Sequence, residues 1–225
     1  MGRNVLVVFA HPDDPDFSCA GTVAKWIADG DEVRYVSCTS GDKGSSDLGI
    51  NPAELSLTRE REQEAAAKEL GVTGCTFLRH KDGELEVTRA FRAEIAQLLR
   101  QFRPDVVVTH DPWQHYQIHP DHRAVGQVVV DAVASARDHL YFEYQTLGEL
   151  HAHRVKDVYL FSPESANLWV DISDTIHRKI AAVSHHKSQI KNNPDVEGRV
   201  RQRAAQAGAS QGLAFAEAFR HIELR

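Results

Sequence analysis

The sequence predicts a single-domain α/β protein in which helices flank a mostly parallel sheet. Short apolar runs alternate along the chain with amphipathic segments of helix length, which is the pattern of parallel strands joined by crossover helices. The chain has 225 residues, which suits a single core. No Gly-, Pro- or Ser-rich linker divides it, so residues 1–225 are expected to form one domain.

The expected strands are short apolar runs. Residues 4–10 (NVLVVFA) are continuously apolar, which is typical of a parallel strand that is covered on both faces. Similar or shorter runs predict the remaining strands at 32–39, 75–78, 105–109, 157–161 and 168–172.

The expected helices lie between these runs. The first is predicted at 18–29, with Ser18 as its N-cap and Gly30 just beyond its end. Apolar side chains at helical spacing predict further helices at 58–70, 87–102, 121–136, 173–191 and after Pro194. Because strand–helix–strand crossovers are right-handed, this order implies a Rossmann-like sandwich.

Composition excludes several classes of protein. The net charge of -6, from 26 basic and 32 acidic residues, argues against a general nucleic-acid or membrane-surface binder. No apolar run approaches the roughly 18 residues of a membrane span, and the first apolar run ends in His and Asp, unlike a signal peptide. A cytoplasmic location is therefore expected. The three cysteines show no CxxC spacing, which excludes a cysteine-rich zinc site and disfavours a disulfide framework.

Histidine and carboxylate side chains gather in two loops. The chain has 13 His, and four of them fall between residues 110 and 122. One loop is AHPDD (10–14), directly after the first strand, and the other is HDPWQHYQIHPDH (110–122), directly after the 105–109 strand. In such sheets, ligands bind beyond the carboxyl ends of the strands, near the point where the strand order reverses. Both loops are therefore expected to face one crevice.

These donors favour zinc over a nucleotide with magnesium. Zinc accepts imidazole nitrogen and carboxylate oxygen, whereas magnesium prefers oxygen alone. The first loop also lacks the G-x-G-x-x-G pattern of a dinucleotide site, since only Gly21 lies near it. Either loop alone could be a turn, and Asp121 could simply cap a helix. Two such loops after two strands predict a catalytic zinc site with an open position for water.

The pair of motifs resembles the zinc-dependent de-N-acetylases of the PIG-L, or LmbE-like, family. AHPDD after the first strand and HPDH (119–122) after a later one carry the resemblance. Weaker matches are TSGDKGS (39–45), RxxE before AA and LG (59–71), DGEL (82–85) and HKSQ (186–189). The chain departs from the family's usual AHPDDE because Pro15 replaces the Glu, and Asp16 follows it as a possible substitute. This departure concerns the shape of the loop more than the metal.

The resemblance implies a metal site and a base. His11, Asp14 and His122 would hold one zinc ion per chain. Asp13 would be the general base that takes a proton from the attacking water, a role worth roughly 10²–10⁴ in rate. Because Asp13 and Asp14 are adjacent, their side chains must diverge.

The resemblance also implies roles around the metal. His119 would stabilise the oxyanion or protonate the departing amine, with Asp121 orienting its ring. Arg59 and Asp82 would contact the sugar, and His186 would lie at the rim of the pocket. Without the resemblance, a surface ion pair would account for Arg59 and a turn for Asp82.

Five further side chains in the second loop are weaker candidates. His110, Asp111 and His115 are close enough to the site in sequence to touch a substrate. Trp113 and Tyr116 could stack on a sugar ring or anchor the loop, and anchoring is the favoured interpretation.

The sequence therefore predicts a zinc-dependent hydrolase that removes an acetyl group from the amine of an N-acetylglucosamine-type sugar or conjugate. Its partner would be a small amino-sugar substrate, and the resemblance suggests a homo-oligomer. One alternative is an amidase of a larger sugar-thiol or antibiotic conjugate. Another is a non-catalytic relative that binds sugar or metal, against which the presence of Asp13 and His119 argues.

Overall fold

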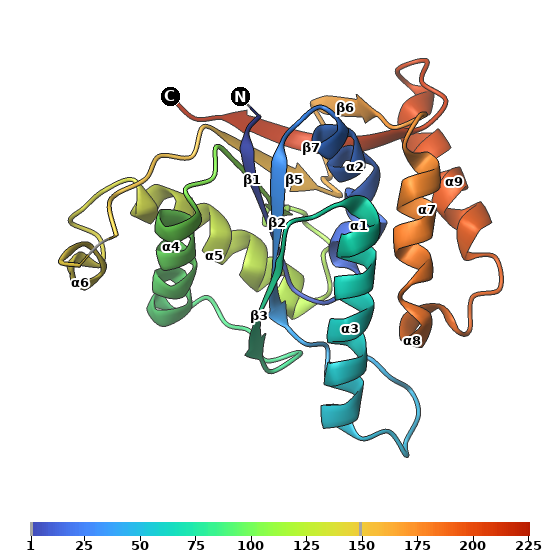
Figure 1. Cartoon of the computed structure of the whole chain (residues 1–225), viewed down its shortest axis with the longest axis horizontal. Coiled ribbons are helices and arrows are strands. Elements are labelled where there is room, and N and C mark those ends of the chain that lie inside the picture. Colours follow the sequence, from blue (N-terminus) through green and yellow to red (C-terminus); the bar gives the residue numbers. More distant parts are fainter. Residues whose placement is uncertain (1, 149) are drawn as a thin grey trace.

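Helices cover both faces of a seven-stranded sheet in the computed structural model, which describes residues 2–148 and 150–225 (Figure 1). The strands are β1 Asn4–Phe9, β2 Glu32–Thr39, β3 Cys75–His80, β4 Val106–His110, β5 Asp157–Phe161, β6 Leu168–Asp171 and β7 Ala216–Glu223. The helices are α1 Asp14–Ser18, α2 Ala20–Ala28, α3 Pro52–Leu70, α4 Arg89–Phe102, α5 Pro120–Ala136, α6 Glu143–Thr146, α7 Ile176–Ser184, α8 Lys187–Ile190 and α9 Val196–Ala209.

The strand order confirms the expected mostly parallel α/β sheet. It runs β3-β2-β1-β4-β5-β7-β6, and the first five strands are parallel. β7 is antiparallel to both of its neighbours, β5 and β6. The order reverses between β1 and β4, so the loops that follow these two strands flank the switch point, where sheets of this kind bind ligands in a crevice.

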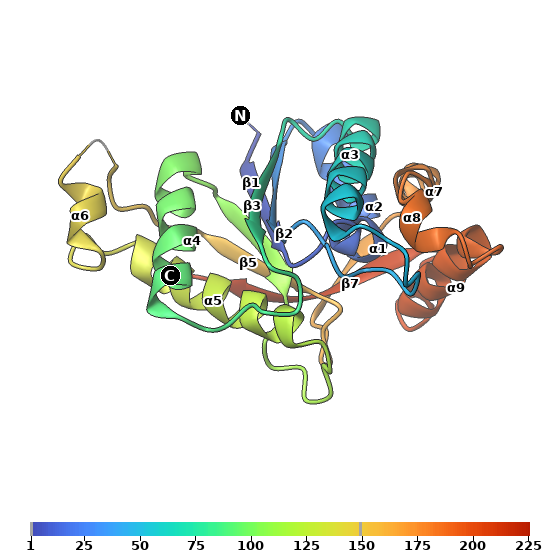
Figure 2. The same ribbon diagram turned by 90° about the horizontal axis from the view of Figure 1, so that it is seen from below.

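Two apolar layers sandwich the sheet. Side chains of β1 alternate, with Leu6 and Val8 in the layer shared with α4 and α5, and Val7 and Phe9 in the layer shared with α2 and α3. Figure 2 shows these helix groups on opposite sides of the strands, with α7 and α9 beyond α2. Among the described residues, no helix is both long and apolar enough to cross a bilayer.

The first helical segment differs from the expected 18–29 helix. The segment begins earlier, at Asp14, and Cys19 separates it into α1 and α2. The Ser18 side chain makes no cap. The first amides of α2, those of Gly21 and Thr22, donate instead to the carboxylate of Glu217 on β7, at 3.0 and 2.7 Å. A carboxylate there satisfies free amides and favours the positive end of the helix dipole. Glu217 lies almost 200 residues away in sequence, so local pattern does not reveal it.

Several other elements differ from expectation, including α6, where no helix was expected. α3 begins at Pro52 and not at residue 58, because Asn51 caps it by accepting from the Ala53 amide at 2.9 Å. The expected 173–191 helix is two helices, α7 and α8, which meet at His186, whose side chain turns inward to Asp16. No strand was expected at β7, which inserts between β5 and β6.

A buried ion pair fixes β7 against α2 and α7. Lys179 Nζ lies 2.5 Å from Glu217 Oε1 and donates to the Phe17 carbonyl at 2.8 Å, with both charged side chains buried. Lys179→Met removes the partner of a buried carboxylate, so we expect unfolding free energy to fall by about 3–5 kcal/mol in urea titrations. The exposed pair Lys156–Asp105 provides the control, since Lys156→Met should change stability by less than about 1 kcal/mol. Equal effects of the two substitutions would contradict this role.

Candidate active site

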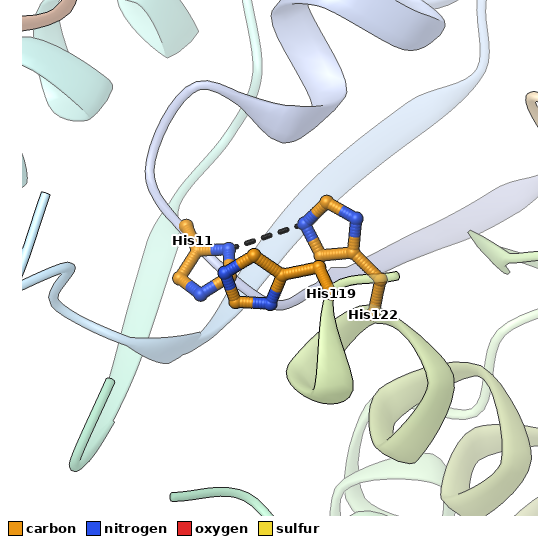
Figure 3. Close-up of side chains that lie close together, drawn as sticks. All are labelled: His11, His119 and His122. Carbon is orange, nitrogen blue, oxygen red and sulfur yellow. Dashed lines mark hydrogen bonds between the residues drawn. The ribbon is translucent and has the colours of Figure 1, made fainter. Parts of the chain in front are cut away.

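The two loops after β1 and β4 meet at the crevice, as Figure 3 shows for three of their histidines. His11 follows β1 and is buried. His119 is the N-cap of α5, and His122 lies in the first turn of that helix. The ring centroids of His11 and His119 are 4.6 Å apart, and those of His119 and His122 are 4.7 Å apart. Parallel strand ends thus bring together residues more than 100 positions apart.

Three side chains of these loops point donor atoms at one another. His11 Nδ1 lies 3.3 Å from His122 Nε2 and 3.5 Å from Asp14 Oδ2. Asp14 Oδ1 lies 3.2 Å from His122 Nε2. The His11 amide donates to Asp14 Oδ2 at 2.8 Å, which fixes the carboxylate beside the first ring. Two imidazole nitrogens and a carboxylate therefore converge on one small volume.

The other ring nitrogen of His11 faces two acids. Its Nε2 lies 3.1 Å from Asp82 and 3.1 Å from Asp121. Burial lowers the pKa of His11, but hydrogen bonds with Asp121, Asp14 and Asp82 outweigh it and raise that pKa to about 11. The carboxylates around this ring thus favour a positive charge in the crevice.

Asp121 does not orient His119 in the expected way. Its carboxylate is fully buried, contacts His11, and accepts the amides of Gly83 and Leu85 at 2.7 and 3.2 Å. Only its backbone N–H reaches His119, donating to Nδ1 at 3.3 Å. Within the first turn of a helix the backbone amide, and not the side chain, faces the N-cap residue. This bond leaves His119 Nε2 as the nitrogen that can donate to a ligand.

Three overlapping sets of side chains lie close enough to share one ion. They are His11, His119 and His122; Asp14, His110 and His122; and His11, Asp82 and Asp121. A ring that binds a metal through one nitrogen commonly donates from the other to a carboxylate. His11 has this arrangement, with Nδ1 toward Asp14 and His122 and Nε2 toward Asp82 and Asp121.

Asp13 lies beside this cluster in an uncommon backbone conformation. Its φ is 105°, in the left-handed region, and its side chain makes no cap with α1. The carboxylate diverges from that of Asp14 and lies 3.4 Å from Arg59 Nη2. Burial raises the pKa of the Asp13 carboxyl to about 7, against the lowering effect of Arg59. A carboxylate of this kind can exchange a proton near neutral pH.

Two residues expected to contact substrate are buried behind the loops. The Arg59 guanidinium donates to the carbonyls of Gly41 and Pro12, at 3.2 and 2.5 Å. His186 was expected at the rim, but its side chain has no exposed surface and lies 2.8 Å from Asp16. The break between α7 and α8 turns its ring into the protein, which the expected continuous helix would not have done. Asp82, the third of these residues, faces His11.

The remaining candidates in the second loop differ in how far they are buried. His110 is buried, accepts the Ala10 amide at 3.2 Å, stacks on His122 at 4.2 Å between centroids and lies 3.3 Å from Asp14 Oδ2, so it belongs to the same cluster. Tyr116 is 90% exposed and Trp113 is 55% exposed. The exposure of Tyr116 does not fit anchoring of the loop, whereas Trp113 lines an apolar cavity together with Val130 and Val133 of α5. His115 is also exposed and lies 2.7 Å from Glu164.

The fold and this crevice define an α/β protein with a candidate metal centre at the switch point of its sheet. The chain belongs to the PIG-L family, because the family model described as GlcNAc-PI de-N-acetylase matches residues 6–133, more than half of it. A diacetylchitobiose deacetylase of Thermococcus kodakarensis is 34% identical over 224 residues, which cover 98% of this chain and 83% of the relative.

Two further relatives agree with this assignment. A 1D-myo-inositol 2-acetamido-2-deoxy-alpha-D-glucopyranoside deacetylase of a Mycobacterium species is 32% identical, over 85% of this chain and 75% of the relative. The solved structure of N,N'-diacetylchitobiose deacetylase from Pyrococcus horikoshii, in complex with its inhibitor MPG, superimposes with a TM-score of 0.94. It is 31% identical, and the match covers 98% of this chain and 84% of that one.

Proposed function

We propose that this protein is a zinc-dependent hydrolase that removes the acetyl group from the amine of an N-acetylglucosamine-type sugar or conjugate. The observation that carries the proposal is the convergence of His11 Nδ1, His122 Nε2 and the Asp14 carboxylate within 3.5 Å of one another. The names of the relatives support the substrate class, since each describes deacetylation of an acetamido sugar.

The donor set fits a catalytic zinc site. Two histidines and one carboxylate are a known zinc ligand set and leave a fourth position open. We assign His11, Asp14 and His122 as ligands, with Asp82 and Asp121 as the carboxylates that hold the second nitrogen of His11. When bound, zinc polarises a carbonyl and lowers the pKa of water to near 7.

The protein's own groups would move the protons. Water attacks the amide carbonyl carbon, and the Asp13 carboxylate takes one of its protons. His119 Nε2, left as the donor because Nδ1 accepts the Asp121 amide, donates a hydrogen bond to the oxyanion of the tetrahedral intermediate, and the proton held by Asp13 passes to the amine nitrogen. The C–N bond then breaks, the amine leaves with a proton, and acetate remains. Arg59 would act on this step by holding the loop of Asp13 and through its ion pair with the Asp13 carboxylate.

The test is deacetylation of defined substrates by the zinc-loaded protein. We expect release of acetate and of a free amine from N,N'-diacetylchitobiose, N-acetylglucosamine or a glycoside of it. Activity on a larger acylated sugar-thiol or antibiotic conjugate alone would favour the amidase alternative. Metal binding without turnover of any of these compounds would favour a binding protein and contradict the proposal.

Asp121→Asn tests the carboxylate that holds the second ring nitrogen of His11, one of the proposed metal ligands. Asp121 holds His11 Nε2 and is itself fixed by two backbone amides, so the substitution should weaken zinc affinity about 10–100-fold. Competition with a chromophoric chelator measures this change. Asp131→Asn on the same helix is the matched control, because among the contacts of the described residues the Asp131 carboxylate accepts only from Gln127, while the Ser135 hydroxyl donates to the Asp131 backbone carbonyl. Unchanged affinity in Asp121→Asn would remove the proposed role.

A further inference from the structure

The peptide bond between Pro12 and Asp13 is held at both ends by α3. Its carbonyl accepts from Arg59 Nη2 at 2.5 Å, and its N–H donates to Gln63 Oε1 at 2.8 Å. Arg59 and Gln63 are four residues apart, so their side chains leave the same face of the helix one turn apart. Both side chains are buried. The plane of this peptide is therefore fixed by one donor and one acceptor on one rigid element.

This clamp acts on the residue with the unusual backbone. Asp13 has a φ of 105°, which non-glycine residues rarely adopt. On its far side, its carbonyl accepts the amides of Asp16 and Phe17 at 3.0 and 3.1 Å, in the first turn of α1. Both peptide planes that flank its Cα are thus held. Because these planes set φ and ψ, they also set the direction of the Cα–Cβ bond from which the Asp13 carboxylate extends.

Gln63 is itself held in one orientation. Its Nε2 donates to Asp16 Oδ2 at 2.7 Å, and the same oxygen lies 2.8 Å from His186 Nε2. A carboxylate that pairs with an imidazole accepts hydrogen bonds, so the amide nitrogen must face Asp16 and the amide oxygen must face Asp13. Gln63, Asp16 and His186 have no exposed surface. A buried relay therefore connects the break between α7 and α8 to the backbone of Asp13.

We infer that Gln63 is a positioning residue, which with Arg59 holds Asp13 in its left-handed conformation and so aims its carboxylate into the crevice. Asp16 and His186 support it by fixing its amide. The inference rests on the proposed function, in which Asp13 is the general base. It also gives buried roles to Arg59 and His186, which the sequence had suggested for substrate.

Gln63→Met tests the inference with a side chain of similar size that cannot accept from the Asp13 amide. We expect kcat for deacetylation to fall about 10–100-fold, with KM changed less than about threefold, because the base is displaced and the substrate surface is not. Zinc content should stay at about one ion per chain. Gln145→Met is the matched control, since Gln145 is equally a buried amide but bonds Arg100 and the Ala93 carbonyl near α4.

The Asp13→Asn background separates positioning from general damage. There, Gln63→Met should lower the residual kcat less than about threefold, because the carboxylate that it aims is already gone. Equal losses in both backgrounds, or full kcat in Gln63→Met alone, would overturn the inference.

Crystal structures give a readout that does not depend on activity. Residue 13 should leave the left-handed region in Gln63→Met and keep it in Gln145→Met. An unchanged φ at residue 13 in Gln63→Met would overturn the inference, whether or not the protein is active. Failure to hydrolyse any of the acetylated sugars would instead contradict the proposed function and leave the φ measurement valid.

Discussion

Asp13→Asn is expected to lower kcat for deacetylation about 10²–10⁴-fold while the protein keeps its metal. The amide of Asn has nearly the shape of the carboxylate but cannot take a proton from water. Asp13 is not among the side chains that converge on the proposed metal position, so zinc content by elemental analysis should remain at about one per chain. Loss of kcat with retained metal separates a base from a ligand.

A carboxylate outside the crevice provides the comparison for Asp13→Asn. Asp105 precedes β4 at the opposite end of the sheet and accepts from the Asn4 amide and Lys156. Asp105→Asn should leave kcat within about threefold of the wild type, because it lies outside the catalytic constellation. If Asp13→Asn retained more than a tenth of the wild-type kcat, Asp13 would not be the base, and another group in the crevice would have to supply the proton transfer.

Local sequence patterns predicted the parts of the fold that depend on local interactions. The apolar run of β1 and the loop after it are contiguous, so their order alone placed His11, Asp13 and Asp14 at a strand end. The second loop followed β4 in the same way. The topology of a parallel sheet then brought the two loops together without any further information.

Local sequence patterns could not predict contacts between residues far apart in the sequence. Glu217 caps α2 from β7, and His186 contacts Asp16 from 170 positions away. The Asp121 carboxylate reaches His11, whereas its neighbour in sequence, His119, was the expected partner. In each case a polar side chain satisfies buried partners on another element, and only the packed structure determines which element that is.

Strand β7 and the role of the Gln63 amide were not predicted for the same reason. β7 reads AEAFRHIE, in which charged and polar residues interrupt the apolar ones, so no continuous apolar run marks it. Gln63 lies beside charged residues on α3 and looks like part of a solvated helix face. The only sequence signal for it was its spacing of four from Arg59, whose importance the family motif had already suggested.

His122→Ala should remove the metal itself. His122 Nε2 lies 3.3 Å from His11 Nδ1 and 3.2 Å from Asp14 Oδ1, so its loss leaves one nitrogen and one carboxylate at the proposed site. Catalytic zinc sites use three protein ligands, and we expect bound zinc to fall from about one to below about a tenth per chain, with activity lost in parallel. Elemental analysis of the purified variant measures the first change.

Two other histidines of the same loop make this result specific. His115→Ala should keep its zinc, because His115 is exposed and bonds Glu164. His119→Ala should also keep zinc but lose kcat, since we assign its ring to a hydrogen bond with the oxyanion and not to the metal. The proximity of His119 to His11 and His122 makes this variant the sharper one. Zinc lost from His119→Ala and retained by an Asp14→Ala variant would identify three histidines as the ligand set. Zinc lost from His122→Ala and Asp14→Ala, but held by His119→Ala, requires the set of two histidines and one aspartate, with His119 left free to act on the substrate.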